Sequence, residues 1–459
     1  MADLREFIST LRARRPRDVL EITRNVSPRH ETAAVMTLLE RKFRSPLVIF
    51  RSIANSKHAV VTNVCGSNDR IALALDCERD HIREVYSKAC RNPMAAVEIG
   101  DGPVREIVQE GVDVDLTRLP QMVYHEGDVD RPYITAAIVG ARDPDSGKVN
   151  LSFHRLMVAG RASTGIFMAR GKHLDLIHRK YKARGEPMPV FAVLGVHPTF
   201  SLGALHTGDL ETEEYGVIGA LQGGPVELVS SLVKGVPPVP ALAEIALEGH
   251  VLPDETVSEG PFGEFTGYAT GKIKAPVLRL AALSCRRNAL FQDIISGQRE
   301  HLLLPIPAIE CHALRVAREV SERVLDVVVV APMTLAVVID KSDDDEARRV
   351  VRRLLESDVY TKNVIAVDCE VNVRKPGELL SAMSLHTQAD RDLSILRHCQ
   401  GSEIDPSVES LTGTTAKLGI DATMTTSARG RAVRNVVPQE VLDRIDLSEL
   451  LSPLGPESN

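Results

Sequence analysis

The sequence contains no Trp, and aromatic residues make up only 4% of its 459 positions. Surfaces that stack nucleic-acid bases and belts at membrane interfaces both need such rings, so the sequence has little material for either. The formal charge of −7, from 55 basic and 62 acidic residues, points the same way, because phosphate backbones are bound by concentrated positive charge. We therefore expect no nucleic-acid partner.

Long hydrophobic runs and a secretion signal are also missing. The first residues are charged and amphipathic, and the most apolar segment, Val327–Ile339, is far shorter than the roughly 20 residues that cross a bilayer. The seven cysteines are dispersed, odd in number and without a CxxC pair, which argues against a disulfide framework or a cysteine-based zinc site. These absences predict a cytoplasmic protein with no membrane span.

Several common cofactor and nucleophile motifs are absent as well. The chain has no GxGxxG after a strand, no GxxxxGK[ST], no GxSxG and no HExxH, so the usual dinucleotide, ATP, serine-hydrolase and zinc-protease classes lose their sequence signature. In other respects the composition is that of an ordinary globular protein, with 44% hydrophobic and 25% charged residues. The length suggests two or three domains.

The chain divides into three stretches by its hydrophobic pattern. Residues 1–115 mix helical spacing with short β-branched runs, and residues 116–312 hold many strand-like runs separated by Gly and Pro turns. Residues 313–459 read β-α-β, with a helix expected over 343–355 and Ser342 as its cap. The sequence therefore predicts an α+β chain with a β-rich middle and a smaller α/β C-terminal domain.

The densest polar motif is Glu259-Gly-Pro-Phe-Gly-Glu264. The Gly-Pro-x-Gly turn between the two glutamates can bring both carboxyl groups to one rim. Two carboxyl groups in a partly dry pocket have diverging pKa values, so one can hold a proton while the other stays ionised. The alternative is a solvated loop with two ordinary glutamates, because paired acids are common.

A second motif, Asn150-Leu-Ser-Phe-His-Arg155, has the alternation of a β-strand. The period of two places Asn150, Ser152 and His154 on one face and Arg155 on the other. An Arg at a strand end can bind a carboxylate in a forked geometry, either that of Glu259 or that of a substrate. A surface strand with ordinary polar positions is the alternative.

Two further motifs carry groups that bind anions or metal ions. Lys172 and His173 open a predicted helix, whose first amides and Lys172 could hold an anion while His173 binds a metal. Glu213 and Glu214 precede an apolar run and offer a carboxylate. Asn, His and Glu ligands together suit Mn²⁺ or Mg²⁺ better than a structural zinc. A single His at a helix start is more often a cap or a surface residue than a metal ligand.

The order of these motifs resembles that of the UbiD-type decarboxylases. Asn-x-x-x-x-Arg is followed by a helix with His, then Glu-Tyr before small apolar residues, then EGPFGE-x-x-GY. The likeness continues in Lys362-Asn-Val-Ile-Ala-Val-Asp368 and Lys417-Leu-Gly-Ile-Asp-Ala-Thr423, so it spans residues 30–425. Enzymes of this family use prenylated FMN to interconvert unsaturated or aromatic acids with CO₂. The sequence departs from the family at Asp368-Cys-Glu and Ser384-Leu-His386.

The resemblance implies a catalytic trio of Arg155, Glu259 and Glu264. Glu264 would be the general acid that protonates the carbon left by CO₂, and Arg155 and Glu259 would form an ion pair beside the cofactor. Decarboxylation at an sp² carbon also needs an electron sink that no side chain provides, which agrees with a cofactor enzyme.

The resemblance also implies a metal and cofactor site. Asn150, His173 and Glu214 match the ligands of a Mn²⁺ (or Mg²⁺) ion that tethers the cofactor phosphate, and K⁺ is a further implied ion. The implied cofactor-contacting residues are Asn150, Ser152, Phe153, Arg155, Lys172, His173, Glu214 and Lys417.

By resemblance, residues 116–312 form a central split β-barrel of flavin-reductase type that holds the cofactor. Residues 1–115 would pack on this core, and residues 313–459 would carry oligomerisation and close over the substrate, joined by a helix near Pro307–Leu325. The substrate pocket is expected near 298–301 and the loop around Thr425. A flavin prenyltransferase would supply the cofactor, the substrate would be a small carboxylic acid, and the assembly would be a homodimer or homohexamer.

Three alternatives stay open at this point. The protein could work as a carboxylase, because one site catalyses both directions of an equilibrium. It could be an accessory or carboxylase subunit of a multi-subunit enzyme, although the complete trio counts against that. It could be an ordinary flavin oxidoreductase, but hydride transfer has no evident need for both Glu259 and Glu264.

Overall fold

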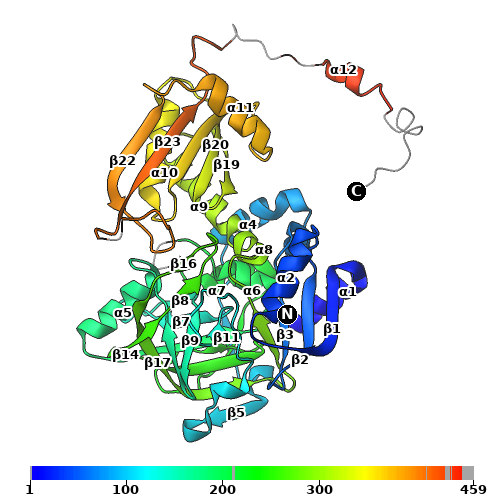
Figure 1. Cartoon of the computed structure of the whole chain (residues 1–459), viewed down its shortest axis with the longest axis vertical. Helices are drawn as coiled ribbons and strands as arrows, with labels where there is room; N and C mark the ends of the chain where they lie inside the picture. Colours follow the sequence, from blue (N-terminus) through cyan, green and yellow to red (C-terminus); the bar gives the residue numbers. More distant parts are fainter. Residues whose placement is uncertain (1–2, 209–211, 410, 430–434, 436, 447–459) are drawn as a thin grey trace.

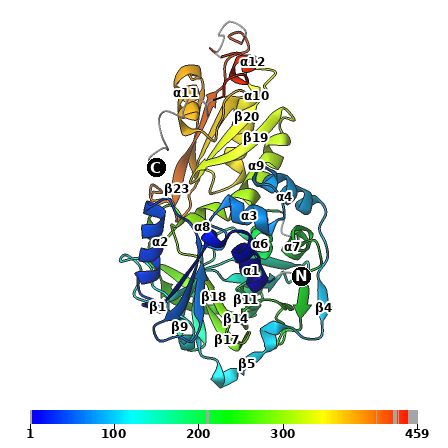
Figure 2. The ribbon, with the colours of Figure 1, turned by 90° about the vertical axis from the view of Figure 1, so that its right-hand side faces the viewer.

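The computed structural model describes residues 3–208, 212–409, 411–429, 435 and 437–446. Within this part of the chain the fold is a mixture of helices and sheets, which confirms the predicted α+β class. No helix among these residues is long and apolar enough to cross a membrane. Figure 2 shows that the sheet formed by residues 324–422 lies at one end of the molecule, apart from the other strands.

The N-terminal part is built around a small sheet (Figure 1), which includes one strand from much later in the chain, labelled β18 in Figure 2. Its elements are α1 (Leu4–Arg14), β1 (Val19–Val26), α2 (Glu31–Arg41), β2 (Leu47–Ile53), β3 (Ala59–Thr62), α3 (Asn68–Ala74), α4 (Ile82–Arg91) and β18 (Leu290–Asp293). The strand order is β1-β2-β3-β18, with β18 parallel to β3. The apolar run that opens β2 is buried because the strand lies inside the sheet.

The central part contains the longest strands. Its elements are β4 (Val97–Ile99), β5 (Ile107–Glu110), β6 (Tyr133–Ile134), β7 (Ile138–Arg142), β8 (Val149–Phe153), β9 (Leu156–Gly160), β10 (Ser163–Ile166), α5 (His173–Ala183), β11 (Met188–Leu194), α6 (Pro198–Gly203), α7 (Glu214–Gln222), β12 (Glu227–Val229), β13 (Val239–Pro240), β14 (Ile245–Glu259), β15 (Phe262–Gly263), β16 (Ala269–Thr270) and β17 (Ile273–Cys285). The main sheet runs β6-β9-β10-β17-β14-β11-β7-β8, and β5 pairs with β17.

The pairing of β14 with β17 shifts register at two places, and such irregularities bend and twist a sheet. Among the described strands the main sheet is an open path from β6 to β8, so no closed barrel is seen. Two small sheets accompany it, β13-β12-β4 and the two-stranded β15-β16. The second of these carries the turn between Glu259 and Glu264.

The C-terminal part is a five-stranded sheet with helices on both faces. Its elements, with the helices that lead into it, are α8 (Arg299–Leu303), α9 (Ile306–Arg318), β19 (Val324–Ala331), β20 (Thr334–Ile339), α10 (Glu346–Ser357), β21 (Asn363–Asp368), α11 (Pro376–His386), β22 (Leu393–Gln400), β23 (Thr414–Ala422) and α12 (Gln439–Leu442). The order is β19-β20-β21-β23-β22. One apolar core lies under α9 and α10 and a second under α11, on opposite faces (Figure 2).

The helix expected over 343–355 is displaced at its start. It begins at Glu346, with Asp345 rather than Ser342 in the cap position. Ser342 instead donates its hydroxyl and backbone N–H to the carboxylate of Glu346, at 2.8 and 2.6 Å. The prediction of Ser342 as the cap is therefore wrong, because these hydrogen bonds to Glu346 hold Ser342 in the turn before the helix.

Candidate active site

The two glutamates of the Gly-Pro-x-Gly turn converge on one guanidinium. Arg155 lies just after β8, and its Nε and Nη2 donate to the two carboxylate oxygens of Glu259 at 2.9 and 3.0 Å. Its Nη1 donates to Glu264. Glu259 is completely buried at the end of β14, and Arg155 is also buried. The turn therefore places both carboxyl groups at one rim, and the solvated-loop alternative does not hold.

Residues from other strands complete this cluster. The hydroxyl of Tyr133 on β6 donates to Glu259 at 3.0 Å, and Arg155 Nη2 donates to the Thr270 hydroxyl on β16 at 3.0 Å. The guanidinium carbon lies 4.1 Å from the ring centre of Phe167 and 5.0 Å from that of Phe262. Sequence analysis missed Tyr133 and Thr270, since neither belongs to a local motif.

The electrostatics of the cluster act differently on Glu264 and on Arg155. Burial raises the pKa of Glu264; Arg155 opposes this shift and the charge of Glu259 adds to it. Burial alone would lower the pKa of Arg155, but the hydrogen bonds and charges of the two glutamates raise it, so it stays cationic. One positive charge thus faces two carboxyl groups, and burial raises the pKa of Glu264.

Asn150, His173 and Glu214 meet at a second cluster. They come from β8, the start of α5 and the start of α7. Asn150 Nδ2 donates to Glu214 Oε1 at 2.9 Å and lies 3.3 Å from His173 Nδ1, while the Leu151 N–H donates to Glu214 Oε2 at 2.8 Å. The structure therefore brings together the three side chains that were predicted as metal ligands.

The donor set of this second cluster fits a hard divalent cation. Glu214 is almost completely buried, and its hydrogen-bond partners among the described residues are the Asn150 amide and a backbone N–H rather than a basic side chain. Burial accordingly raises the pKa of Glu214 to about 8. A bound cation would compensate this burial, with the Asn150 amide turned so that its oxygen faces the ion.

The rest of the Asn150–Arg155 motif follows the predicted alternation. The Ser152 hydroxyl lies between Asn150 Oδ1 at 3.3 Å and His154 Nε2 at 2.8 Å, so the three share one face. Burial lowers the pKa of His154 to about 4, and its ring is therefore neutral. Phe153 packs against the apolar cores of the central part.

Three models of one enzyme family match successive parts of the chain. They describe the N-terminal, Rift-related and C-terminal domains of 3-octaprenyl-4-hydroxybenzoate carboxy-lyase, and they match residues 11–89, 95–299 and 306–422. The chain belongs to the UbiD family. The family assignment made from the motifs is thereby confirmed, and the protein is an enzyme of the decarboxylase kind.

Relatives of this UbiD-family chain cover almost its whole length. It is 31% identical over 441 residues to the anhydromevalonate phosphate decarboxylase of Methanosarcina mazei, covering 95% of this chain and 99% of the relative. It resembles the structure of the UbiD-class enzyme HmfF of Pelotomaculum thermopropionicum in complex with FMN, with a TM-score of 0.87, 33% identity, and coverage of 98% and 100%. It also resembles the closed form of vanillic acid decarboxylase of Sedimentibacter hydroxybenzoicus, with a TM-score of 0.89, 26% identity, and coverage of 98% of this chain and 99% of the other.

In this UbiD-family enzyme the two predicted cofactor lysines meet one turn of the C-terminal part. Lys172 Nζ forms an ion pair with Asp358 at 2.9 Å and lies 4.7 Å from the ring centre of Tyr360. Lys417 is buried and donates to the carbonyl oxygens of Leu355 and Asp358, both at 2.6 Å. Lys417 therefore caps the end of α10 in this structure, and its contact with a cofactor phosphate stays a prediction.

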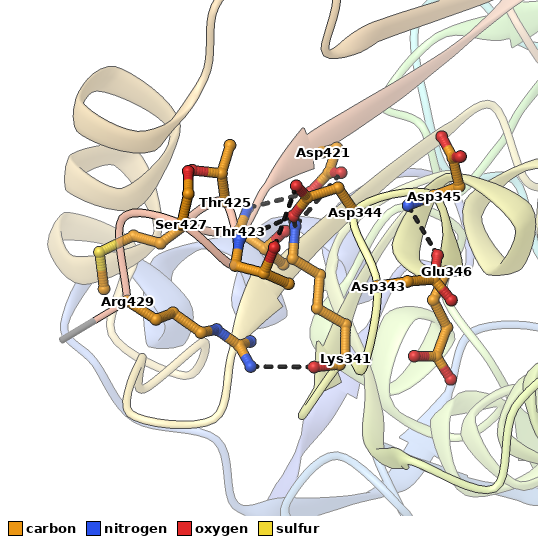
Figure 3. Close-up of polar contacts among 12 residues, drawn as sticks. Lys341, Asp343, Asp344, Asp345, Glu346, Asp421, Thr423, Thr425, Ser427 and Arg429 are labelled. Carbon is orange, nitrogen blue, oxygen red and sulfur yellow. Dashed lines mark hydrogen bonds and ion pairs between the residues drawn. The ribbon is translucent and has the colours of Figure 1, made fainter.

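The loop around Thr425 lies away from this junction. Lys417 lies in the first half of β23, and its partner Asp358 lies in the turn before β21. Thr425, in contrast, follows the last residue of β23. There the loop is held by a polar network, in which the Thr426 N–H donates to Asp344 at 2.7 Å and Arg429 donates to the Lys341 carbonyl oxygen at 3.0 Å (Figure 3). In this structure Thr425 thus lies at the end of β23 away from the two lysines, and its place in the substrate pocket stays a prediction.

Another loop of the C-terminal part contacts the chain close to the turn between Glu259 and Glu264, which is called the catalytic turn below after its predicted role. The Thr266 hydroxyl, two residues after Glu264, donates to the carbonyl oxygen of Ile404 at 3.0 Å. His301 lies near the same place, with its ring edge-on to Phe265 at 5.8 Å, and burial together with Arg155 lowers the pKa of His301 to about 4. The Gln298–His301 segment thus lies beside the catalytic turn.

Proposed function

We propose that the protein is a prenylated-FMN-dependent, non-oxidative and reversible decarboxylase of a small aromatic, heteroaromatic or α,β-unsaturated carboxylic acid. The observation that carries this proposal is the buried Arg155 guanidinium holding Glu259 and Glu264, with Glu264 biased toward protonation. When bound, the cofactor would supply the electron sink that no side chain offers. The residues of the chain then need only to orient the acid, exclude water and deliver one proton.

The proton comes from Glu264 in this proposal. Its carboxyl proton passes to the carbon that has lost CO₂, and the carboxylate that remains is stabilised by Arg155. Glu259 keeps the guanidinium in place through its two hydrogen bonds, and Tyr133 fixes Glu259 in turn. Solvent returns the proton to Glu264 before the next turnover.

The second cluster would hold the cofactor. Asn150, His173 and Glu214 are proposed to bind Mn²⁺ (or Mg²⁺) together with the cofactor phosphate, with Ser152 and Lys172 close by. The buried Glu214 carboxylate, which has no basic side chain among its described hydrogen-bond partners, supports the cation. The implied K⁺ ion has no residue assigned to it, and a flavin prenyltransferase would provide the cofactor.

A second substrate class is favoured by the relatives. The Methanosarcina mazei relative is named for anhydromevalonate phosphate, whereas the structural neighbours include decarboxylases named for vanillic acid and 3,4-dihydroxybenzoic acid. A phosphorylated unsaturated acid is therefore the second candidate beside the aromatic acids. Parallel assays of CO₂ release from both kinds of acid distinguish the two.

The C-terminal part is proposed to carry a homo-oligomer interface. The side chains Leu380 and Leu385 of α11 and Leu393 and Ile395 of the edge strand β22 are exposed, and clusters of apolar residues at a sheet edge commonly mark subunit contacts. A homodimer or homohexamer follows from this proposal, and light scattering measures it. The split-barrel description and closure of the C-terminal part over the substrate belong to the same proposal.

The decisive test starts with protein coexpressed with a flavin prenyltransferase. Its absorbance spectrum and the mass of the small molecule released on denaturation identify the cofactor, and CO₂ release by the purified single chain excludes an accessory-subunit role. Prenylated FMN together with turnover supports the proposal. Folded, metal-loaded protein that contains no flavin would overturn it.

A further inference from the structure

A short segment outside the predicted site forms hydrogen bonds to the backbone of the turn between Glu259 and Glu264. The segment His125–Val129 precedes β6 and is distant in sequence from the turn. The Val129 N–H donates to the Pro261 carbonyl oxygen at 2.7 Å, and the Gly263 N–H donates to Asp128 Oδ1 at 2.8 Å. The backbone on the N-terminal side of Glu264 is thus bound at two points by this segment.

Both carboxylate oxygens of Asp128 accept hydrogen bonds. Its side chain is only 2% exposed, although the adjoining residues Glu126 and Gly127 are exposed. While Oδ1 accepts from Gly263, Oδ2 accepts the His125 N–H at 2.9 Å and lies 3.2 Å from His125 Nδ1. Burial would raise the pKa of Asp128, but these hydrogen bonds outweigh it and lower the pKa, so the carboxylate is ionised.

The position of Gly263 leaves the turn little freedom. A Cβ atom at this residue would lie 2.9 Å from His125 Nδ1, so only glycine allows the turn to approach the segment this closely. The Gly263 carbonyl oxygen accepts from the Ser296 hydroxyl. Both polar backbone groups of the residue before Glu264 are therefore held by buried or half-buried side chains from elsewhere in the chain.

We propose that Asp128 is a positioning residue for Glu264: by holding the Gly263 N–H it keeps the Glu264 carboxyl group within reach of Arg155 and of the reacting carbon. The inference rests on the proposed role of Glu264 as proton donor. A carboxylate that accepts a buried backbone N–H forms a charge-assisted bond, which is stronger than a neutral one. Because proton transfer requires hydrogen-bond distances, a small displacement of the turn has a large effect on rate.

The test compares Asp128→Ala with Asp130→Ala in the cofactor-loaded enzyme. Asp130 lies two residues away, is exposed and pairs with Arg29, so its removal controls for the loss of a charge in this segment. For Asp128→Ala we expect kcat to fall about 10- to 100-fold with KM and flavin content nearly unchanged. We also expect a larger solvent deuterium isotope effect on kcat, because proton transfer becomes the slow step. Asp130→Ala should match the unaltered enzyme.

A conservative variant separates positioning from folding. Asp128→Asn keeps an oxygen that can accept the Gly263 N–H but puts an NH₂ group against the His125 N–H, so it should recover part of kcat and bring the isotope effect partly back toward the normal value. Hydrogen exchange of the 260–268 peptide should be faster in Asp128→Ala than in Asp128→Asn. A purely structural role would instead lower flavin content or melting temperature and leave the isotope effect of the remaining active enzyme unchanged, which would overturn the inference.

Glu264→Gln, assayed in parallel, distinguishes failure of this inference from failure of the proposed function. If Glu264→Gln abolishes turnover but Asp128→Ala behaves like the unaltered enzyme, the positioning role of Asp128 is wrong and the proton donor stands. If Glu264→Gln retains turnover, the proposed proton donor is wrong. Hydrogen exchange at Gly263 then still reports whether Asp128 holds the turn.

Discussion

The candidate site has two ends, the cluster around Arg155 and the second cluster around Glu214, and they differ in whether the chain itself supplies groups of both charges. Around Arg155, the positive charge, both carboxyl groups and the Tyr133 and Thr270 hydroxyls all come from the chain. Around Glu214, a buried carboxylate meets an amide and a backbone N–H but no basic side chain among its described hydrogen-bond partners. This difference agrees with the proposal that the first end handles a proton and the second receives a cation.

Removing the acid at the first end should have the largest effect. In Glu264→Gln the side chain keeps its size but loses the transferable proton, so we expect kcat for decarboxylation to fall about 10³-fold. Flavin and metal content should stay normal, since Glu264 does not belong to the second cluster. The measurement is CO₂ release per bound flavin, and undiminished release would remove the functional distinction between the two ends.

Removing the charge at the second end should affect loading rather than chemistry. Glu214→Gln replaces the carboxylate by a carboxamide of similar size, which carries no negative charge to balance a divalent cation. The metal and flavin recovered per chain should therefore fall about tenfold or more. Elemental analysis and absorbance measure both. Glu213→Gln is the matched control, because that neighbouring carboxylate accepts the Val149 N–H at 3.1 Å and pairs with Lys148 Nζ at 3.6 Å, and neither partner belongs to the cluster. Equal loading in the two variants would contradict the assignment.

The pH dependence of kcat should follow the first end. Glu264 must be protonated to donate, and burial raises its pKa, so activity should be present below that pKa and decline above it. The decline approaches about tenfold per pH unit when proton transfer limits turnover. Steady-state rates at saturating substrate, on enzyme of constant flavin content, give the profile. A rate that increases across the same range would mean that Glu264 acts as a base.

The ion pair at the domain junction should matter least. Lys172 and Asp358 are both partly exposed, and pairs of this kind contribute little, so Lys172→Met and Asp358→Asn should be coupled by about two- to fivefold in apparent flavin affinity. The exposed Arg352–Glu356 pair on α10, also 2.9 Å long, is the matched control and should show no coupling to flavin. A coupling as large as the Glu214 effect would place the junction inside the cofactor site.

Local patterns, taken together with the family resemblance, located most of the candidate site. The alternation of Asn150, Ser152 and His154, the helix start at His173 and the turn between Glu259 and Glu264 are all short-range features, and the structure reproduces each of them. Such patterns are reliable because they follow from the period of a strand, the start of a helix and the conformations that Gly and Pro permit.

Contacts between distant segments were out of reach. Tyr133, Thr270 and Asp128 act on the catalytic cluster from three separate elements, and no spacing rule connects them to Arg155 or Gly263. The position of Thr425 could not be derived from the sequence for the same reason, because the direction of β23 relative to the central part decides which of its ends faces Arg155. Lys417 likewise found its partners on the neighbouring α10–β21 turn.

By itself, the sequence determined the fold class, the family and the order of the chemical groups along the chain, because each depends on periodicity or on short motifs. Only the tertiary structure decided which carboxyl group is buried beside which charge. It also decided that β18 joins the N-terminal sheet and that Asp128 supports the catalytic turn. Desolvation and hydrogen bonding depend on distances between segments far apart in the chain, and those distances exist only once the chain has packed.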